Sequence, residues 1–417
     1  MKKIFYPEDY GAVADGKTLT TRYIQTAIDN AGEINGRVVL KKGIYLTGSL
    51  FLKSNLEFII EEEAELRGTN EEGQYPIIPS RIAGIEMTWP AGLLNIIKEK
   101  NVILMGKGTV NGEGKFWWDK YWNMRKEYEE KNLRWAVDYD CFRPRNLVVY
   151  QGENIQLKEF RCIQSGFWNV HICYSKDVLV EGIEIQKNQG PSTDGIDIDS
   201  SHHVIVRGCS IDCNDDNICV KAGRDWDGLR VNEPCDDVLI ENCRIGSGAG
   251  ITLGSETSGG IHNITIRNIK FEDTMCGFRI KSARTRGGLI EDINVEALTM
   301  ENVATPFSFL LDWNPSYSYC SIPSDYNRNI PEYWETLSKA VSKEDGMPVV
   351  RNISIKEVTA FADKENSRSK MAFEIEGFEE QPIENIKFEN IGIEAVEPGS
   401  IKHVKNLQMK DVTVTIE

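Results

Sequence analysis

Two short segments with the same pattern, Asp194-Gly195-Ile196-Asp197-Ile198-Asp199 and Asp216-Asn217-Ile218-Cys219-Val220-Lys221, decide the fold. Each begins with an aspartate and continues with alternating apolar and polar residues. This alternation is typical of a β-strand with one buried face. The two segments therefore predict equivalent strands in successive structural repeats.

A related pattern returns along most of the chain. Each copy starts with Asn, Asp or His and continues with alternating apolar residues, and the copies begin at residues 101, 154, 177, 203, 237, 263, 292, 352, 385 and 406. This irregular spacing fits a solenoid with loops of variable length better than a leucine-rich repeat or a propeller. Hairpin turns of the Asn-Gly type, which a sandwich or propeller would need, are nearly absent. We therefore expect an all-β fold, a single-stranded right-handed parallel β-helix of about ten turns.

One domain is expected over residues 1–417, because no long Pro-, Ser- or Gly-rich linker interrupts the chain. A helical pattern from residue 20 to about residue 31 predicts a short helix that caps the N-terminal end of the coil. Two segments without the repeat pattern, near 112–140 and 313–350, are expected to be loop insertions. Both are rich in aromatic residues, which either stack on sugar rings or pack the loops down.

Composition limits the partners and the compartment. The net charge of −16 argues against nucleic acid or an anionic membrane surface as a partner, although an acidic substrate can still bind where basic residues gather. No apolar stretch is long enough for a signal peptide or a membrane span. The ten cysteines lack zinc-type spacing and are expected to be reduced and mostly buried. We expect a cytoplasmic protein without metal or cofactor, although a secreted form that has lost its signal would look the same. The oligomeric state stays open.

Stacking the repeats in register makes aligned positions of successive strands into neighbours, about 4.8 Å apart. Five aligned segments begin at residues 168, 194, 216, 249 and 276. Their apolar members form an inward column of Val170, Ile196, Ile218, Ile251 and Phe278. The alternate positions are expected to face solvent. They form two columns of polar, charged and thiol side chains, namely His171, Asp197, Cys219, Thr252 and Arg279, and Cys173, Asp199, Lys221, Gly254 and Lys281.

Three aspartates, Asp194, Asp215 and Asp216, are expected to meet on this surface. Like charges at close range raise the pKa of at least one of them. A single aspartate in a solenoid turn is commonly structural, but a cluster with cations beside it suits glycoside hydrolysis. There, one protonated carboxyl group supplies a proton to the leaving oxygen while others activate water. Arg279 and Lys281 on the same face could hold a substrate carboxylate.

Three sequence blocks, Ser192-Thr193-Asp194, Asn214-Asp215-Asp216 and Arg279-Ile280-Lys281, resemble the signature blocks of the polygalacturonases of glycoside hydrolase family 28. They occur in the family's order, and the resemblance covers most of the chain. It implies a right-handed, pectin-lyase-like β-helix and hydrolysis with inversion of configuration.

The resemblance also implies a role for each residue of these blocks. Asp215 would be the general acid, and Asp194 and Asp216 would position and activate the water. Arg279 and Lys281 would bind the galacturonate carboxylate at the cleavage subsite.

Two residues depart from the family pattern, and one of them bears on the substrate. The fourth block of the family, Gly-His-Gly, reads Gly248-Ala249-Gly250 here, and Ser192 stands where the family has Asn. Alanine can neither donate a side-chain hydrogen bond nor carry a charge, so other groups must maintain the proton on Asp215. The rhamnogalacturonan-cleaving branch of the family is similar in lacking this histidine, which favours a rhamnogalacturonan-type substrate. An inactivated copy or an engineered substitution would also leave an alanine.

Four further residues are expected to bind substrate: Lys221, Trp168, His171 and Arg224. Trp168 shares a column with the aspartates and could stack on a sugar ring. His171 lies one rung from Asp197 and either binds substrate or is hydrogen-bonded within the polar column. Arg224 belongs to a segment that resembles insertions of exo-acting bacterial members.

The expected function is that of an inverting, exo-acting glycoside hydrolase that cleaves galacturonosyl linkages in pectin-derived oligosaccharides of the rhamnogalacturonan type. An exo-polygalacturonase acting on homogalacturonan is one alternative. A polyuronide lyase is another, and it would depend on calcium and form an unsaturated product. A non-catalytic, carbohydrate-binding β-helix such as an adhesin would show no turnover.

Overall fold

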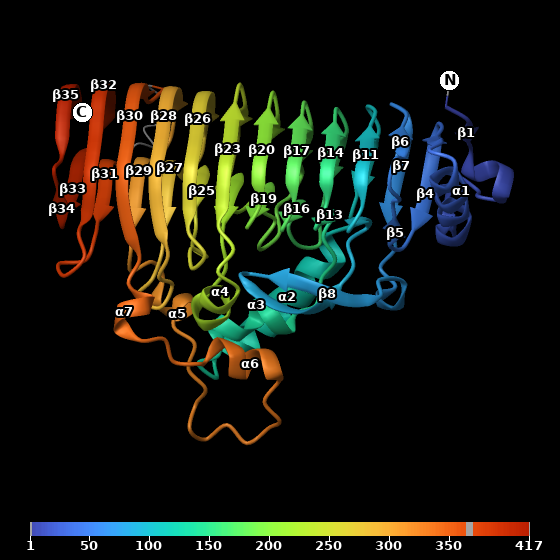
Figure 1. The fold of residues 1–417 in the computed structure, drawn as a ribbon, viewed down its shortest axis with the longest axis horizontal. Coiled ribbons are helices and arrows are strands. Elements are labelled where there is room, and N and C mark those ends of the chain that lie inside the picture. Colours follow the sequence, from blue (N-terminus) through green and yellow to red (C-terminus); the bar gives the residue numbers. More distant parts are fainter. Residues whose placement is uncertain (1, 364–369, 417) are drawn as a thin grey trace.

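The strands follow one another along a single long axis, with the two ends of the chain at opposite ends of the coil (Figure 1). The computed structural model describes residues 2–363 and 370–416. Successive turns pair in parallel within two long sheets, one of 22 and one of 11 strands. The right-handed parallel β-helix expected from the repeats is confirmed.

The 11-stranded sheet carries the aligned segments. Its strands are β5 (Leu50–Phe51), β10 (Leu94–Ile97), β13 (Leu147–Tyr150), β16 (Val170–Cys173), β19 (Ile196–Asp199), β22 (Ile218–Lys221), β25 (Ile251–Leu253), β27 (Cys276–Lys281), β29 (Thr305–Leu310), β31 (Met371–Glu376) and β33 (Glu397–Lys402).

The 22-stranded sheet forms the remaining sides of the coil. Its strands are β1 (Ile4–Phe5), β2 (Asp15–Leu19), β3 (Arg37–Leu40), β4 (Gly43–Thr47), β6 (Glu57–Ile60), β7 (Ala64–Gly68), β11 (Lys100–Met105), β12 (Thr109–Asn111), β14 (Glu153–Lys158), β15 (Arg161–Ile163), β17 (Lys176–Glu181), β18 (Glu184–Gln186), β20 (His202–Arg207), β21 (Ser210–Ile211), β23 (Cys235–Glu241), β24 (Arg244–Ile245), β26 (Ile261–Glu272), β28 (Leu289–Glu301), β30 (Val349–Phe361), β32 (Ile383–Ala395), β34 (Val404–Lys405) and β35 (Gln408–Ile416).

The residue that begins each repeat has a backbone reason to be Asn or Asp. All ten of these residues, from Asn101 to Asn406, have φ between 52° and 59°. Among residues other than glycine, Asn and Asp enter this left-handed region most readily. Several of these side chains also donate to the equivalent residue of the preceding turn, as Asn154 does to Asn101 at 2.8 Å and Asn385 to Asn352 at 3.0 Å. The repeat pattern therefore marks one corner of the coil.

The inward column forms the centre of the core. Val170, Ile196, Ile218, Ile251 and Phe278 are paired in the expected register and are fully buried. Burying such a side chain contributes about 1.5–3 kcal/mol. The apolar alternation therefore both fixes the register and stabilises the coil.

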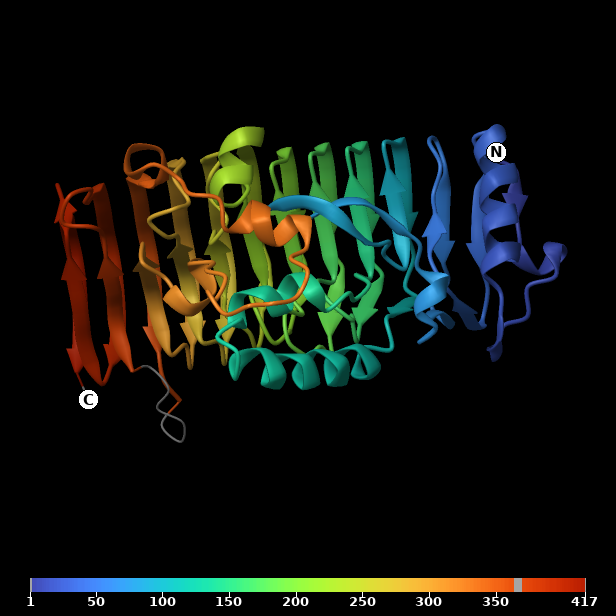
Figure 2. The same ribbon diagram turned by 90° about the horizontal axis from the view of Figure 1, so that it is seen from below.

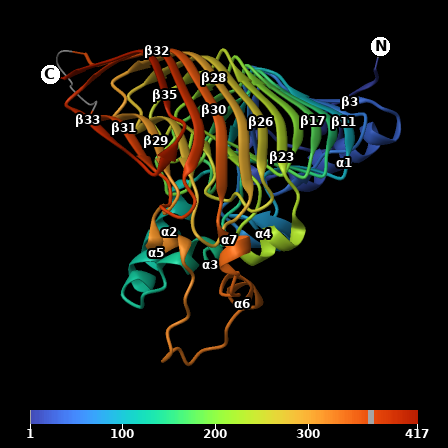
Figure 3. The ribbon, with the colours of Figure 1, turned by 60° about the vertical axis from the view of Figure 1, so that its left-hand side comes forward.

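Helices occur at one end and along one side of the coil. Helix α1 (Thr21–Glu33) packs on β1, β3 and β5 at the N-terminal end, as the helical pattern predicts. The others lie together beside the strands (Figures 1 and 3), and they are α2 (Lys115–Glu129), α3 (Val137–Asp140), α4 (Asp225–Val231), α5 (Pro315–Ser318), α6 (Glu332–Leu337) and α7 (Lys343–Gly346). Short 3₁₀ turns are η1 (Pro7–Tyr10), η2 (Glu72–Gln74) and η3 (Arg134–Ala136). None of the described helices is long and apolar enough to cross a bilayer.

An antiparallel hairpin, β8 (Ile77–Ile82) and β9 (Ile85–Pro90), was not expected from the sequence. Its loop consists of Ala83 and Gly84, which have φ of 41° and 87°. Two positive φ angles are typical of a tight hairpin turn, but such turns usually have Asn-Gly or Asp-Gly, so Ala83-Gly84 gave no clear signal. The hairpin lies across the strands of the coil together with the helices (Figure 2).

The hairpin and the helices change the environment of the outward columns. We expected these residues to face solvent, but His171, Asp197, Cys219 and Thr252 have no exposed surface. The outward direction is correct, because these residues alternate with the core column. The expectation of solvent exposure is wrong because chain segments outside the repeats cover this side of the sheet.

Candidate active site

A pocket lies where these covering segments meet the 11-stranded sheet. Its empty space is about 520 Å³, part of which is open to solvent. Its lining combines residues of the coil with residues of the hairpin and both insertions, namely Ala83, Arg134, Asp138, Phe167, Trp168, Ser192, Asp194, Asp215, Asp216, Lys221, Ser255, Glu256, Lys281, Trp313, Asn314 and Tyr317.

The three aspartates predicted to form one patch do lie together. Asp194 precedes β19, and Asp215 and Asp216 precede β22 on the next turn. One oxygen of each lies within 4.8 Å of the others. Asp194 and Asp216 are buried, whereas Asp215 is partly exposed in the pocket. Parallel register between adjacent turns therefore produces the cluster.

Asp216 is held in its ionised form. Burial alone would raise the pKa of this carboxyl, but the charges of Lys281, Arg279 and Lys221 together hold it well below its usual range. The Nζ of Lys281 lies 2.6 Å from Oδ2 of Asp216, and a guanidinium nitrogen of Arg279 lies 3.5 Å from Oδ1. The hydroxyl of Thr252 donates to the same carboxylate at 2.7 Å.

The other two aspartates favour the protonated form. Burial raises the pKa of Asp215, and the negative charge of Asp216 raises it further. Burial also raises the pKa of Asp194, with added contributions from Asp197 and Asp215. The cluster thus combines a fixed carboxylate with neighbours that keep a proton to higher pH than ordinary aspartates, and paired acid and base chemistry requires such a difference.

We expect kcat/KM to be highest at acidic pH and to fall as pH rises. As pH rises through the raised pKa of Asp215, the proton donor is lost and activity falls. On the acidic side, activity should persist until Asp216 takes up a proton, because the pKa of this water-activating carboxylate is held well below its usual range. Initial rates on an oligogalacturonate from about pH 3 to about pH 9 would test this. Activity that increases into the alkaline range would contradict it and would fit a lyase base instead.

Lys221 is the centre of a second charged group in the pocket. Its Nζ lies 3.3 Å from Glu256, 3.4 Å from Asp197 and 3.7 Å from Asp194. Burial raises the pKa of Asp197 to about 8, and the charge of Asp216 adds to this against the opposing effect of Lys221. The sequence analysis missed Glu256. Its position immediately beyond the strand that follows Ala249 was the available signal.

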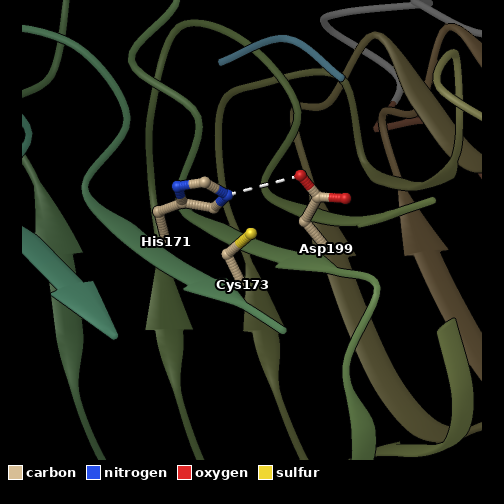
Figure 4. A group of neighbouring side chains, drawn as sticks. All are labelled: His171, Cys173 and Asp199. Atoms are coloured by element: carbon tan, nitrogen blue, oxygen red, sulfur yellow. Dashed lines mark ion pairs between the residues drawn. The ribbon is translucent and has the colours of Figure 1, made fainter. Parts of the chain in front are cut away.

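His171 lies outside the pocket. Arg145 contacts Nδ1 of His171 at 2.6 Å, and Nε2 lies 3.5 Å from Asp199, next to Cys173 (Figure 4). Because a guanidinium only donates, Nδ1 must accept and Nε2 must carry the proton. Burial lowers the pKa of His171 to about 4. The predicted direct contact with substrate is therefore corrected: His171 is a neutral histidine bonded within the polar column.

Arg224 and Trp168 also differ from their predicted roles. Arg224 is fully buried, and it donates to the hydroxyl of Tyr139 at 2.8 Å and to the carbonyl of Tyr317 at 2.7 Å, so it joins the two insertions instead of facing substrate. Trp168 lines the pocket but is only 3% exposed. Its ring stacks on Phe167 and lies under the Lys221 ammonium, and it offers no open face to a sugar.

The insertions add pocket residues that the repeat pattern could not place. Arg134 and Asp138, from the 112–140 insertion, bond to each other at 2.7 Å. Trp313 and Tyr317 come from the 313–350 insertion, and Trp313 lies 4.4 Å from the Lys281 ammonium. A single aromatic or basic residue in a loop carries no sequence signal for its partner across the site.

Within the described part of the chain, two groups of side chains have the spacing to ligate a metal: Asp194 with Asp215 and Asp216, and His171 with Cys173 and Asp199. Cationic side chains already compensate both groups. Lys281 and Arg279 pair with the first, while Arg145 and Arg81 contact the second. A divalent cation would have to compete with these fixed charges.

Comparison with known proteins agrees with this geometry. The family model for glycosyl hydrolases family 28 matches residues 81–322. An exo-poly-α-D-galacturonosidase of Dickeya chrysanthemi is 26% identical over 99% of this chain and 71% of its own length. An endo-polygalacturonase of Pectobacterium carotovorum is 27% identical over 70% of this chain and 72% of its own. The crystal structure of an exopolygalacturonase from Thermotoga maritima has a TM-score of 0.83 at 25% identity, covering 99% of this chain and 92% of that one. The chain therefore belongs to glycoside hydrolase family 28 and is a glycosidase.

Proposed function

We propose that this glycosidase removes galacturonosyl residues from the end of pectin-derived oligosaccharides. The contact between the two insertions carries this proposal. The indole nitrogen of Trp135 donates to the carbonyl of Ser321 at 3.1 Å, the Arg134 guanidinium lies over the ring of Tyr317, and Trp135 packs on Trp334. Segments that meet in this way would block a chain from passing through the site, while a chain end could still enter.

The reaction that fits the site is a single hydrolytic displacement. Asp215 gives its proton to the glycosidic oxygen as the bond from that oxygen to C1 breaks. A water molecule held by Asp194 and Asp216 attacks C1 and passes its proton to the ionised carboxylate of Asp216. Lys281 and Arg279 supply positive charge for the carboxylate of a galacturonate.

We propose that the configuration at C1 is inverted. Inverting glycosidases commonly separate their carboxyl groups by about 6.5–9.5 Å, whereas retaining enzymes have about 5–5.5 Å. The aspartate oxygens here lie within 4.8 Å, so the distance alone would not suggest inversion. The proposal of inversion rests instead on the similarity to the family. The anomer of the first product, observed by NMR, distinguishes inversion from retention.

For the substrate we propose a rhamnogalacturonan fragment first. The supporting observation is Ala249, which is buried and whose backbone N–H donates to the carbonyl of Asp215 at 2.9 Å, in the block where the family places histidine. Homogalacturonan is the second candidate, because the Thermotoga maritima and Dickeya chrysanthemi relatives are named as enzymes of polygalacturonate.

Product analysis on defined oligosaccharides tests the proposal. With galacturonate and rhamnogalacturonan oligomers of equal length, we expect shortening by one terminal residue at a time and faster release from the rhamnogalacturonan series. A ladder of mid-length products would contradict exo action. A large preference for the galacturonate series would select the second candidate, and no shortening of either would overturn hydrolysis of these linkages.

We also propose that the enzyme works inside the cell and that its acidic oligosaccharide substrate is taken up from outside. All ten cysteines are free thiols, and nine of them are buried. Free thiols in this number are typical of a reducing compartment.

A further inference from the structure

Beside the catalytic aspartates, the pocket contains an acceptor and a donor that the proposed reaction does not use. Glu256 and Lys221 both line the pocket and are 2% and 5% exposed. The ammonium of Lys221 also lies 3.7 Å from Asp194. A sugar residue in contact with the aspartates is therefore within reach of this pair.

Glu256 is an ionised acceptor. Burial opposes ionisation, but the charges of Lys221, Arg286 and Arg224 lower its pKa to about 2. The hydrogen bonds that Glu256 accepts from side chains are long. They come from the Ser255 hydroxyl at 3.2 Å, the Lys221 ammonium at 3.3 Å and the Tyr317 hydroxyl at 3.4 Å. Hydrogen bonds to a carboxylate are normally about 2.5–2.9 Å, and a carboxylate can accept about four. Glu256 can therefore take a shorter bond from a ligand hydroxyl.

Lys221 is the matching donor. Its ammonium has three donor positions, and the carboxylates around it lie at 3.3–3.7 Å. The Trp168 ring, 4.9 Å away, fixes it on one side. A donor and an acceptor 3.3 Å apart can serve two neighbouring sugar hydroxyls, one of which donates to Glu256 while the other accepts from Lys221.

We infer that Lys221 and Glu256 recognise two adjacent free hydroxyls on the galacturonosyl residue bound at Asp194, Asp215 and Asp216. A terminal galacturonosyl ring carries hydroxyls on C2, C3 and C4, so either adjacent pair includes O3. A substituent on O3 removes the bond to Glu256 where O3 is the donor, and crowds the Lys221 ammonium where O3 is the acceptor. In both cases it places an extra group in a buried, charged part of the pocket. The inference rests on the proposed function and adds a specificity to it: the enzyme discriminates against terminal residues that carry an acyl or alkyl group on O3.

The test measures binding and turnover separately. Calorimetric titration of the wild-type protein with galacturonic acid and with its 3-O-methyl ether should show about 10- to 100-fold weaker binding of the ether, because a buried charged group loses its partner. In Glu256→Gln, binding of galacturonic acid should weaken, and the difference between the two ligands should shrink to less than about threefold. Glu233→Gln, a half-exposed glutamate outside the pocket, is the matched control and should keep the wild-type difference.

Equal binding of both ligands to the wild-type protein would overturn the inference, as would an unchanged difference in Glu256→Gln or no binding of galacturonic acid. If Glu256→Gln does not fold, the binding of the two ligands to the wild-type protein is sufficient to test the inference. Hydrolysis of the unsubstituted oligomer is assayed in parallel. Discrimination without hydrolysis would refute the proposed function alone, and equal hydrolysis of unsubstituted and 3-O-methylated ends would refute the inference alone.

Discussion

Asp215→Asn is expected to lower kcat by about 10²- to 10⁴-fold while leaving the fold intact. The amide has the size of the carboxyl but no proton to give to the leaving oxygen. Burial and the charge of Asp216 raise the pKa of Asp215, so its carboxyl keeps a proton to higher pH than an ordinary aspartate, and the neutral amide resembles that protonated form. Its oxygen can still accept from the backbone N–H of Asp216, as Oδ1 of Asp215 does at 3.0 Å.

Initial rates on the best oligosaccharide substrate, together with thermal unfolding, would check this. Asp212→Asn is the matched control, since it changes an exposed aspartate of the same turn that does not line the pocket. It should keep the wild-type rate. An Asp215→Asn variant with more than a tenth of wild-type activity would show that another group donates the proton.

Lys281→Met should destabilise the protein by about 3 kcal/mol at neutral pH and also abolish most of its activity. Methionine fills the volume of the lysine stem but carries no charge. The Asp216 carboxylate therefore loses its nearest cation, the Lys281 ammonium, which lies 2.6 Å away in the wild-type protein. Removing one member of a buried ion pair costs about 3–5 kcal/mol, and Arg279, at 3.5 Å, keeps the expected loss at the lower end.

The pH dependence of this loss gives a specific test. A carboxyl with a lowered pKa in the folded state adds stability above its unfolded pKa, about 3.9, and that stability is lost as pH decreases towards the folded pKa. The difference in the free energy of unfolding between the wild-type protein and Lys281→Met should therefore be largest near pH 7 and should become smaller below about pH 4. Urea unfolding at both pH values measures it, with Lys107→Met as an exposed control. A difference that does not change with pH would mean that Lys281 stabilises the fold by packing and not through Asp216.

The sequence was sufficient for the aspartate cluster because its geometry follows from local rules. Strand alternation has a period of two, and parallel strands in a coil keep their register, so Asp194 and Asp216 had to be neighbours. The same reasoning placed Arg279 and Lys281 on the outward face of the sheet, beside the aspartates. It failed for His171, because register predicts the direction of a side chain and not the segment that covers it. The role expected for Arg224 rested on resemblance alone, and Arg224 is instead buried between the two insertions.

The sequence by itself therefore determined the coil and the position of its catalytic candidates. Asn and Asp at each corner, with φ near 55°, and apolar residues at alternate positions act within a few residues of chain, and their effect repeats on every turn. Only the tertiary structure decided which residues complete the site beyond the aspartates and the lysines of the stacked columns. Glu256 and Arg134 became pocket residues because the hairpin and two insertions without any repeat fold across the sheet. Single long-range contacts, such as those of Arg224 with Tyr139 and Tyr317, hold them there, and such contacts leave no periodic signal in a sequence.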